Sequence, residues 1–188
     1  GTIQLFINKE DQKIKEMKEY MDIVNFKYDN YEKYSFFNEY KLNITIGDLL
    51  NEYLTKQEAK EFEENYMDGP ISAIKVSEYN SIIQLKGQQP INISEDEVLL
   101  VSNYEQMNSG LNIFMKNQNT INIDDKVYTI KNDLPIKENI VTTGSYLNFF
   151  YLIIPDSFTG GLNLSSTGFN VMFEENDPKQ LEETFSNF

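Results

Sequence analysis

The side chains of this chain that could do chemistry are carboxylates, which occur in three close groups. Acid and base catalysis needs such a pair when one carboxyl group holds its proton and the other does not. The groups are Glu61-Glu63-Glu64, Glu95-Asp96-Glu97 and Glu174-Glu175 with Asp177. A chain with 30 acidic residues among 188 contains such groups by chance, and charged runs usually face solvent or begin helices. We therefore expect these acids to be solvated and the chain not to be an enzyme.

The side chains that serve most other catalytic and ligating roles are missing. The sequence has no cysteine, no histidine and no arginine. Without the first two there are no thiolate or imidazole metal ligands, and no nucleophile–histidine pair of the hydrolase kind. Without arginine there is no bidentate clamp for carboxylate or phosphate groups. We expect no cofactor and no catalytic residue.

Calcium is the metal ion that the remaining oxygen ligands could hold. Asp124, Asp125 and Asp133 could supply such ligands, but the alternating acids, the glycine and the distal glutamate of an EF-hand loop are absent. Gly160-Gly161 lacks the Lys-Ser/Thr pair of a phosphate-binding loop and is interpreted as a turn. We predict no metal site.

The charge of the chain limits its partners. The formal net charge is −14, whereas binding to nucleic acid or to anionic lipid needs a basic face. Nucleic acid is therefore excluded as a partner. A cationic partner would be attracted, although solubility alone is the plainer interpretation of the charge. The candidate residues for a cationic ligand lie in the more acidic second half and are Asp124, Asp125, Glu174 and Glu175.

A dense aromatic segment lies in the first quarter of the chain. It contains Tyr28, Tyr31, Tyr34, Phe36, Phe37 and Tyr40. Aromatic side chains line grooves for apolar or peptide ligands, and they also fill ordinary cores. Core and edge packing is the preferred interpretation.

Hydrophobic periodicity and capping signals divide the chain into short elements. Helices are predicted over 9–21, 46–53, 55–66, 77–86 and 178–188. Strands are predicted over 2–8, 22–27, 71–76, 97–102, 120–123, 126–130, 148–154 and 168–173, with 140–143 as a further pairing segment. The segment 29–40 has no clear pattern, and 104–108 is predicted as a short helix or turn.

The order of these elements favours an α+β fold, with a mixed, largely antiparallel sheet and several short helices. The length suits one domain over residues 1–188, with two lobes as an alternative. No apolar run approaches the ~20 residues that a membrane-spanning helix needs. The longest run, Phe149–Ile154, has the length of a buried strand.

The segment from Ile74 to Asn103 carries a resemblance to a known family. It combines a strand, a helix start Ser77-Glu-Tyr-Asn, a helix end Leu85-Lys-Gly-Gln-Gln-Pro-Ile and an acidic-led strand. This resembles part of the large extracellular domain of FtsX-like ABC transporter permeases, in particular the Bce type of Gram-positive bacteria. The motif is structural, with Ser77 as helix cap and Gly87 as helix stop. No functional residue is therefore carried over.

The resemblance implies that the chain is an extracellular domain excised from a membrane permease, at the outer face of the cytoplasmic membrane. It implies a cytoplasmic ABC ATPase and a sensor histidine kinase as partners of the intact permease. It also implies a role in resistance to peptide antibiotics of the bacitracin and lantibiotic kinds, with a cationic peptide or a cell-wall lipid intermediate as ligand. The alternatives are a docking domain of the same family that binds an envelope protein, and an unrelated acidic surface lipoprotein domain.

Overall fold

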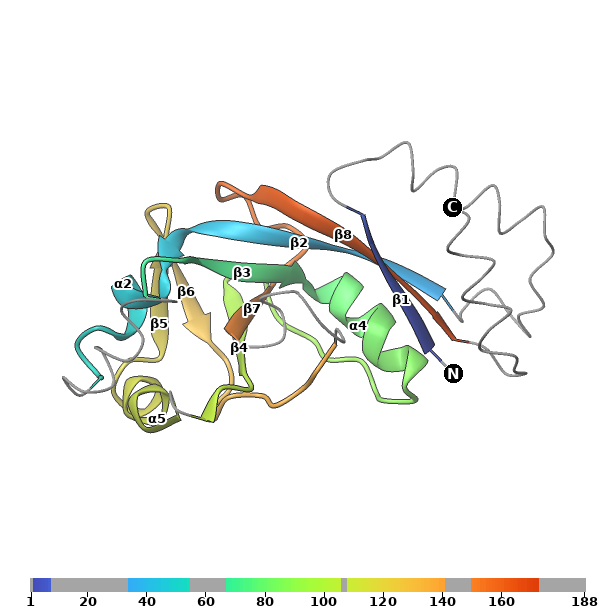
Figure 1. Ribbon diagram of the computed structural model, residues 1–188. Coiled ribbons are helices and arrows are strands. Elements are labelled where there is room, and N and C mark those ends of the chain that lie inside the picture. Colours follow the sequence, from blue (N-terminus) through green and yellow to red (C-terminus); the bar gives the residue numbers. More distant parts are fainter. Residues whose placement is uncertain (1, 8–33, 55–66, 106–107, 141–149, 173–188) are drawn as a thin grey trace.

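The computed structural model describes residues 2–7, 34–54, 67–105, 108–140 and 150–172. The strands in this part of the chain are β1 (Thr2–Ile7), β2 (Tyr34–Thr45), β3 (Pro70–Lys75), β4 (Glu97–Ser102), β5 (Thr120–Ile123), β6 (Lys126–Ile130), β7 (Phe150–Ile154) and β8 (Asn163–Met172). The helices are α2 (Ile46–Leu50), α4 (Val76–Leu85) and α5 (Asn108–Asn117). Figure 1 shows the long strands β2 and β8 running side by side along the molecule.

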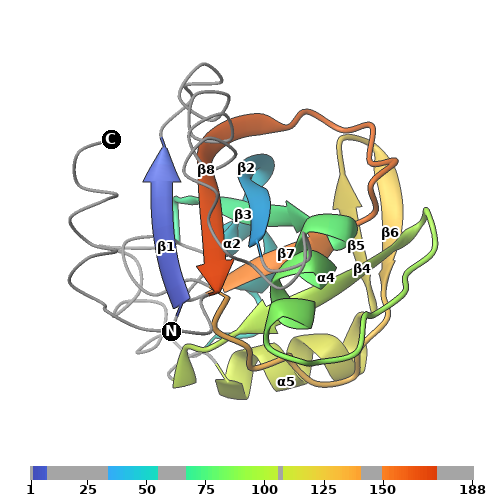
Figure 2. The ribbon, with the colours of Figure 1, turned by 90° about the vertical axis from the view of Figure 1, so that its right-hand side faces the viewer.

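These strands form one mixed sheet in the order β1-β8-β2-β3-β7-β4-β6-β5. The β3–β7 and β4–β6 pairs are parallel, and the other five pairs are antiparallel. The predicted α+β class, with a largely antiparallel sheet and short helices, is confirmed. Figure 2 shows β1 and β8 at one end of the sheet and the β5–β6 hairpin at the other.

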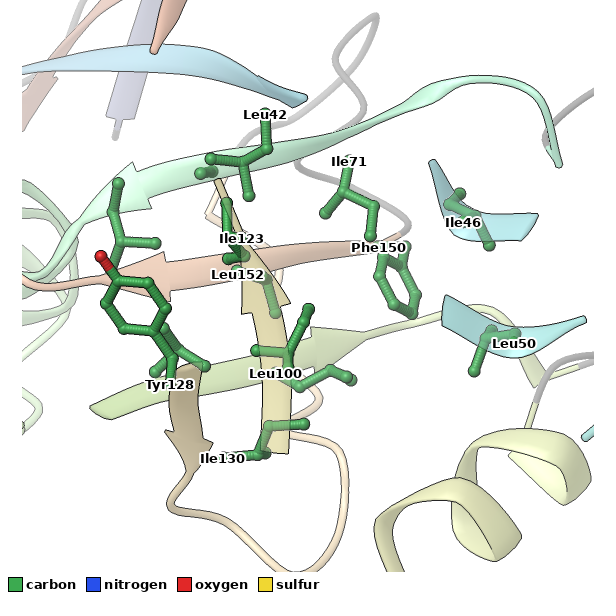
Figure 3. Packing of buried hydrophobic residues seen from close by; sticks show 14 of the residues in the cluster. Leu42, Ile46, Leu50, Ile71, Leu100, Ile123, Tyr128, Ile130, Phe150 and Leu152 are labelled. Atoms are coloured by element: carbon green, nitrogen blue, oxygen red, sulfur yellow. The ribbon is translucent and has the colours of Figure 1, made fainter. Parts of the chain in front are cut away.

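The central strands β3, β7 and β4 are buried on both faces, which explains their almost continuous apolar sequences. In β7, for example, Phe150, Leu152 and Ile154 face a larger core, and Tyr151 and Ile153 face a smaller one. Figure 3 shows the larger core, where side chains of these strands meet those of β5, β6 and α2. Helix α4 covers the smaller core.

The β5–β6 hairpin folds over the larger core and brings the far edge of the sheet close to β2. Its turn residues, Asp124 and Asp125, have φ values of 49° and 65°, the left-handed values that a two-residue hairpin loop needs. The predicted tight acidic turn is confirmed. The Asp124 carboxylate accepts hydrogen bonds from Nδ2 of Asn43 (3.3 Å) and from the backbone N–H of Gly161 (2.6 Å). These bonds tie the hairpin to β2 and to the loop before β8.

Helix α4 begins differently from the prediction but ends as predicted. The predicted cap Ser77 lies inside the helix, so that prediction is wrong. The Ser77 backbone N–H instead donates to Oδ1 of Asp156 (3.1 Å), an acid that follows β7. A distant carboxylate therefore satisfies an N-terminal amide and complements the helix dipole. The predicted helix stop is confirmed, because Gly87 adopts φ 78° after the last turn.

Two asparagine side chains fix irregular segments. Each forms hydrogen bonds with both the N–H and the C=O of one distant residue, as a residue of a neighbouring strand would. Nδ2 of Asn80 donates to the carbonyl of Ile91 (2.8 Å), and Oδ1 of Asn80 accepts from the N–H of Ile91 (2.9 Å). Asn132 makes the same two bonds with Leu100, at 2.8 and 3.0 Å. The asparagine of the helix-start motif therefore fixes the loop after α4.

Several elements differ from the sequence predictions. Helix α5 was not predicted from sequence, because the short helix or turn predicted at 104–108 ends at the residue where α5 begins. Its Asn, Ser and Gly residues have weak helix propensity, and it forms because Leu111, Phe114 and Met115 are buried on one face. Strand β2 covers much of the segment that had no clear pattern.

Other differences concern boundaries. Helix α2 ends at Leu50 rather than at residue 53, and β8 begins at Asn163 rather than at 168. The predictions over 9–21, 22–27, 55–66 and 178–188, and most of 140–143, lie outside the described residues. No helix in the described ranges has the length and apolar character that a membrane crossing requires.

Candidate functional site

A cleft of about 670 Å³ lies between α2, the turns that flank it, the end of α5 and β5. Figure 1 shows these elements gathered at the end of the molecule away from α4. Clefts of a few hundred to about 1,000 Å³ are typical of ligand sites. We therefore take this cleft as the candidate functional site.

Two contacts fix α2 at one wall of the cleft. Oγ1 of Thr45 accepts from the backbone N–H of Asp48 (3.0 Å), and Oδ2 of Asp48 accepts from the N–H of Thr45 (2.9 Å), which makes a reciprocal capping box. The N–H of Gly47 donates to the carbonyl of Met67 (2.8 Å). A Cβ at Gly47 would lie 2.9 Å from that oxygen, so a glycine is needed for this approach.

Tyr53 connects α2 to the opposite wall. Its ring packs edge-on against Phe114 of α5, with centroids 5.3 Å apart. Its hydroxyl donates to Oε1 of Gln118 (2.9 Å), the residue that follows α5. Met67 and Ile121 line the cleft but are only 5% and 3% exposed, so the apolar surface within its mainly polar lining comes from partly exposed side chains such as Ile44 and Leu49.

The charged side chains among the described lining residues are all acidic. They are Asp48, Glu52 and Asp68. Asp48 and Glu52 are four residues apart, about one helical turn. A cation in the cleft would meet this local negative charge as well as the net charge of −14 of the whole chain. An acidic rim beside small apolar areas can bind a ligand that carries both basic and apolar groups.

A buried polar network lies elsewhere, where β2 meets β3 and β8. Nζ of Lys41 lies 2.6 Å from Oγ of Ser72 and 3.2 Å from Oε1 of Glu39. Glu39 also accepts from the hydroxyls of Ser72 and Ser166, each at 3.0 Å. Burial lowers the pKa of Lys41, although Glu39 opposes this effect. These contacts connect β2, β3 and β8.

The Lys41–Ser72 pair has the form of a base and a nucleophile. However, Ser72 is 1% exposed within a central strand, so no substrate can reach its hydroxyl. Removing one member of a buried ion pair leaves the other uncompensated. We therefore interpret this network as structural.

Glu78 is an acid with an unusual environment in the first turn of α4. Its Oε1 accepts the backbone N–H of Asn38 in β2 (2.9 Å), where β3 does not pair with β2. Burial raises the pKa of Glu78 to about 7; the hydrogen bond from Asn38 and the charge of Lys75 oppose this rise, and Asp156 adds to it. The carboxyl group thus replaces a strand partner and titrates near neutral pH.

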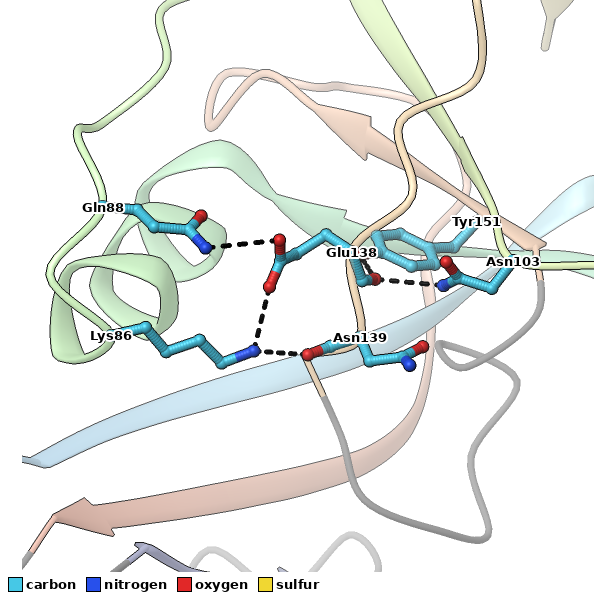
Figure 4. Close-up of polar contacts among 6 residues, drawn as sticks. All are labelled: Lys86, Gln88, Asn103, Glu138, Asn139 and Tyr151. Carbon is cyan, nitrogen blue, oxygen red and sulfur yellow. Dashed lines mark hydrogen bonds and ion pairs between the residues drawn. The ribbon is translucent and has the colours of Figure 1, made fainter.

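Glu138 is the centre of a polar cluster beyond the C-terminal end of α4, shown in Figure 4. Its carboxylate accepts from Lys86 (3.0 Å) and Gln88 (3.4 Å), and its carbonyl accepts from Asn103 (3.1 Å) and Tyr151 (3.4 Å). Burial holds the pKa of Tyr151 well above its usual value. The cluster clamps the segment after β6 to α4 and to the sheet.

The structure does not place the sequence-predicted ligand residues in the cleft where it describes them. Asp124 and Asp125 lie at the tip of the β5–β6 hairpin, and neither lines the cleft. Asp124 is already bonded to Asn43 and Gly161. Glu174 and Glu175 lie outside the described residues.

The other acidic groups were predicted to be solvated. Oε1 of Glu97 accepts the N–H of Ser94 (2.8 Å), and this hydrogen bond lowers the pKa of Glu97. Glu95, Asp96 and Asp133 are exposed. Glu61, Glu63, Glu64 and Asp177 lie outside the described residues. Within the described ranges, no cluster of acidic or other ligating side chains could hold a metal ion.

The aromatic segment contributes to the cores. Phe37 is fully buried in the smaller core, and Tyr40 packs against the larger one. Core packing, the preferred interpretation, is confirmed for Phe37. Tyr28 and Tyr31 lie outside the described residues.

Sequence reasoning missed the cleft. Its acids Glu52 and Asp68 are separated by a predicted helix, and the end of α5 lies far along the chain from both. The available local signal was the pattern Thr45-Ile-Gly-Asp48, which marks the start of α2. That pattern predicts a helix but not the approach of Met67 or Gln118.

No protein-family model matches this chain, and no curated protein or solved structure is similar enough to count as a match. The resemblance of Ile74–Asn103 to FtsX-like permeases therefore stays a prediction.

Proposed function

We propose that this chain is a non-catalytic recognition domain that binds cationic peptides in the cleft beside α2. The observation that carries the proposal is the acidic rim of the cleft, formed by Asp48, Glu52 and Asp68. This rim adjoins the partly exposed apolar side chains of Ile44 and Leu49 in an otherwise mainly polar lining. A peptide with basic and apolar side chains complements both features.

The proposed setting is the outer face of a cell membrane, in an FtsX-like permease of the Bce type. The support is the sequence resemblance of Ile74–Asn103. In this setting the domain senses peptide antibiotics, and the intact permease works with a cytoplasmic ABC ATPase and a sensor histidine kinase. The domain itself supplies recognition and no chemistry.

The test is a calorimetric titration at low ionic strength with a capped hexapeptide of alternating lysine and valine. The cleft variant is Glu52→Gln with Asp68→Asn. The control is Glu95→Gln with Asp133→Asn, which makes the same charge change at exposed acids that do not line the cleft. Because exposed ion pairs contribute up to about 1 kcal/mol each, we expect the cleft variant to bind about tenfold more weakly and the control nearly normally.

Two results would overturn the proposal. One is no binding of the peptide at low salt. The other is an equal loss of affinity in the cleft variant and the control, because this would make the attraction a property of the net charge alone. The variant Asp125→Asn, in the same titration, tests the site predicted from sequence against the cleft.

A further inference from the structure

Strand β5 forms one side of the cleft and is an edge strand. In the sheet of described residues it stands last in the strand order and pairs with β6 alone. Ile121 and Asn122 of β5 line the cleft. An edge strand presents unpaired backbone groups that can accept a further strand.

The hydrogen-bond alternation of the hairpin shows which backbone groups face outward. The N–H of Ile130 in β6 donates to the carbonyl of Asn119 (2.7 Å). Bonded and non-bonded pairs alternate along an antiparallel ladder. Because Asn119 is a hydrogen-bonded position, Ile121, two residues later, also forms backbone hydrogen bonds to β6. Asn122, the next residue, does not. The N–H and C=O of Asn122 therefore point away from β6, at the side of β5 that a further strand would pair with.

Two residues before Asn122, a side chain already makes a hydrogen bond of the kind that an added strand would make. Nε2 of Gln118 donates to the carbonyl of Thr120 (3.3 Å), the preceding outward-facing residue of β5. Gln118 is in turn held by the Tyr53 hydroxyl. Asn122 has no corresponding partner in the described part of the chain, so its backbone pair is the open position.

The end of β2 lies on the other side of the cleft. Pairing between β2 and β8 ends at Lys41 with Asn163, and Ile44 and Thr45 beyond that point line the cleft. The bond from Asn43 to Asp124 closes the space at the hairpin tip. The cleft thus lies between two strand segments that approach each other at one end.

We propose that a basic peptide binds in extended form as an added strand on the outer edge of β5, with one of its residues exchanging backbone hydrogen bonds with Asn122. Strand addition draws its affinity from main-chain bonds and its selectivity from side-chain contacts. Here Asp48, Glu52 and Asp68 select basic side chains. The inference rests on the proposed function and narrows its ligand to extended, rather than helical, basic peptides.

The first test compares two proline variants of the hairpin with the Lys–Val hexapeptide as probe. Asn122→Pro removes the outward N–H, which an edge strand tolerates because that group makes no ladder bond. Val127→Pro is the matched control, since Val127 is the cross-strand partner of Asn122, is 59% exposed and has its N–H on the side away from β5. We expect Asn122→Pro to bind about tenfold more weakly and Val127→Pro to bind as the unchanged chain does. Equal affinities of the two variants would overturn the inference.

The second test uses the unchanged chain and does not depend on how the variants fold. Two forms of the hexapeptide carry N-methyl groups, one at every lysine and the other at every valine. Alternate residues of a strand direct their N–H groups to opposite edges, so one form should bind and the other should lose about tenfold in affinity.

The outcomes separate the two proposals. Equal affinities of the methylated forms, together with weakened binding by Glu52→Gln with Asp68→Asn, would overturn strand addition and leave the recognition function standing. Absence of binding by the parent hexapeptide would overturn both.

Discussion

Polar side chains in this molecule often stand in for backbone partners that the sheet and helices lack. Glu78 accepts the N–H of Asn38 where β2 has no neighbour in β3. Asn132 pairs with both backbone groups of Leu100, and Asp156 accepts a helix N-terminal amide of α4. These bonds give Glu78, Asn132 and Asp156 a structural role.

Glu78 makes stability depend on pH. Its pKa rises from an ordinary 4.5 to about 7 in the folded chain, so the folded state holds this proton more tightly than the unfolded state. The stability from this group is present below pH 4.5 and is lost as pH rises to about 7. We expect Glu78→Gln to remove that part of the decline, so that the stability of the variant relative to the unchanged chain is about 1–2 kcal/mol higher at pH 8 than at pH 4.5, after discounting for partial exposure.

Urea unfolding of both proteins between pH 4.5 and pH 8 measures this effect. The control is Glu95→Gln at an exposed position, which should keep the slope of the unchanged chain. Parallel curves for Glu78→Gln and the unchanged chain would show that folding does not raise the pKa of Glu78.

Among the elements, those with local signals could be predicted from sequence. The apolar run of β7, the Asp124-Asp125 turn and the glycine after α4 each depend on neighbouring residues, and the structure has all three. Helix α5 could not be predicted, because its weak helix formers are stabilised by burial of Phe114 against distant strands. The cleft was missed for the same reason, since its acids come together through contacts such as that of Gly47 with Met67.

Helix α5 should therefore depend on its packing. Phe114 is fully buried and contacts Tyr53 at the cleft wall, whereas Ile113 is 47% exposed. We expect Phe114→Ala to lower the free energy of unfolding by about 3–5 kcal/mol. Ile113→Ala, the adjacent control, should change it by about 0.5 kcal/mol or less. Chemical denaturation measures both, and similar losses in the two variants would contradict a packing origin for α5.

At the scale of the whole molecule, the sheet is curved so strongly that the β5–β6 hairpin contacts β2. The Asp124 carboxylate joins the β5–β6 hairpin to β2 through Asn43 and to the loop before β8 through Gly161. The larger core lies inside this curl. The cleft lies beside this junction, so the shape of the cleft depends on the bonds that hold the hairpin against β2.

Loss of this junction should loosen the hairpin. Asp124→Gly removes the carboxylate and keeps the positive φ at no steric cost. Asp125→Gly is the matched control, because its neighbour keeps the bonds to Asn43 and Gly161. We expect Asp124→Gly to be about 1 kcal/mol less stable than Asp125→Gly. Hydrogen exchange at the amides of Ile121 and Ile123 should also be faster in the first variant, and identical exchange would contradict a role for the junction.

Strand β8 lies between β1 and β2, and its Val171 pairs with both Ile3 and Tyr34. Neither β1 nor the first part of β2 has another partner strand among the described residues. On the ribosome, both segments must therefore wait for their shared partner until nearly all of the described chain has been made. Pairings this distant in sequence slow folding and leave edges open to aggregation meanwhile. A nascent chain would thus benefit from a chaperone until β8 emerges.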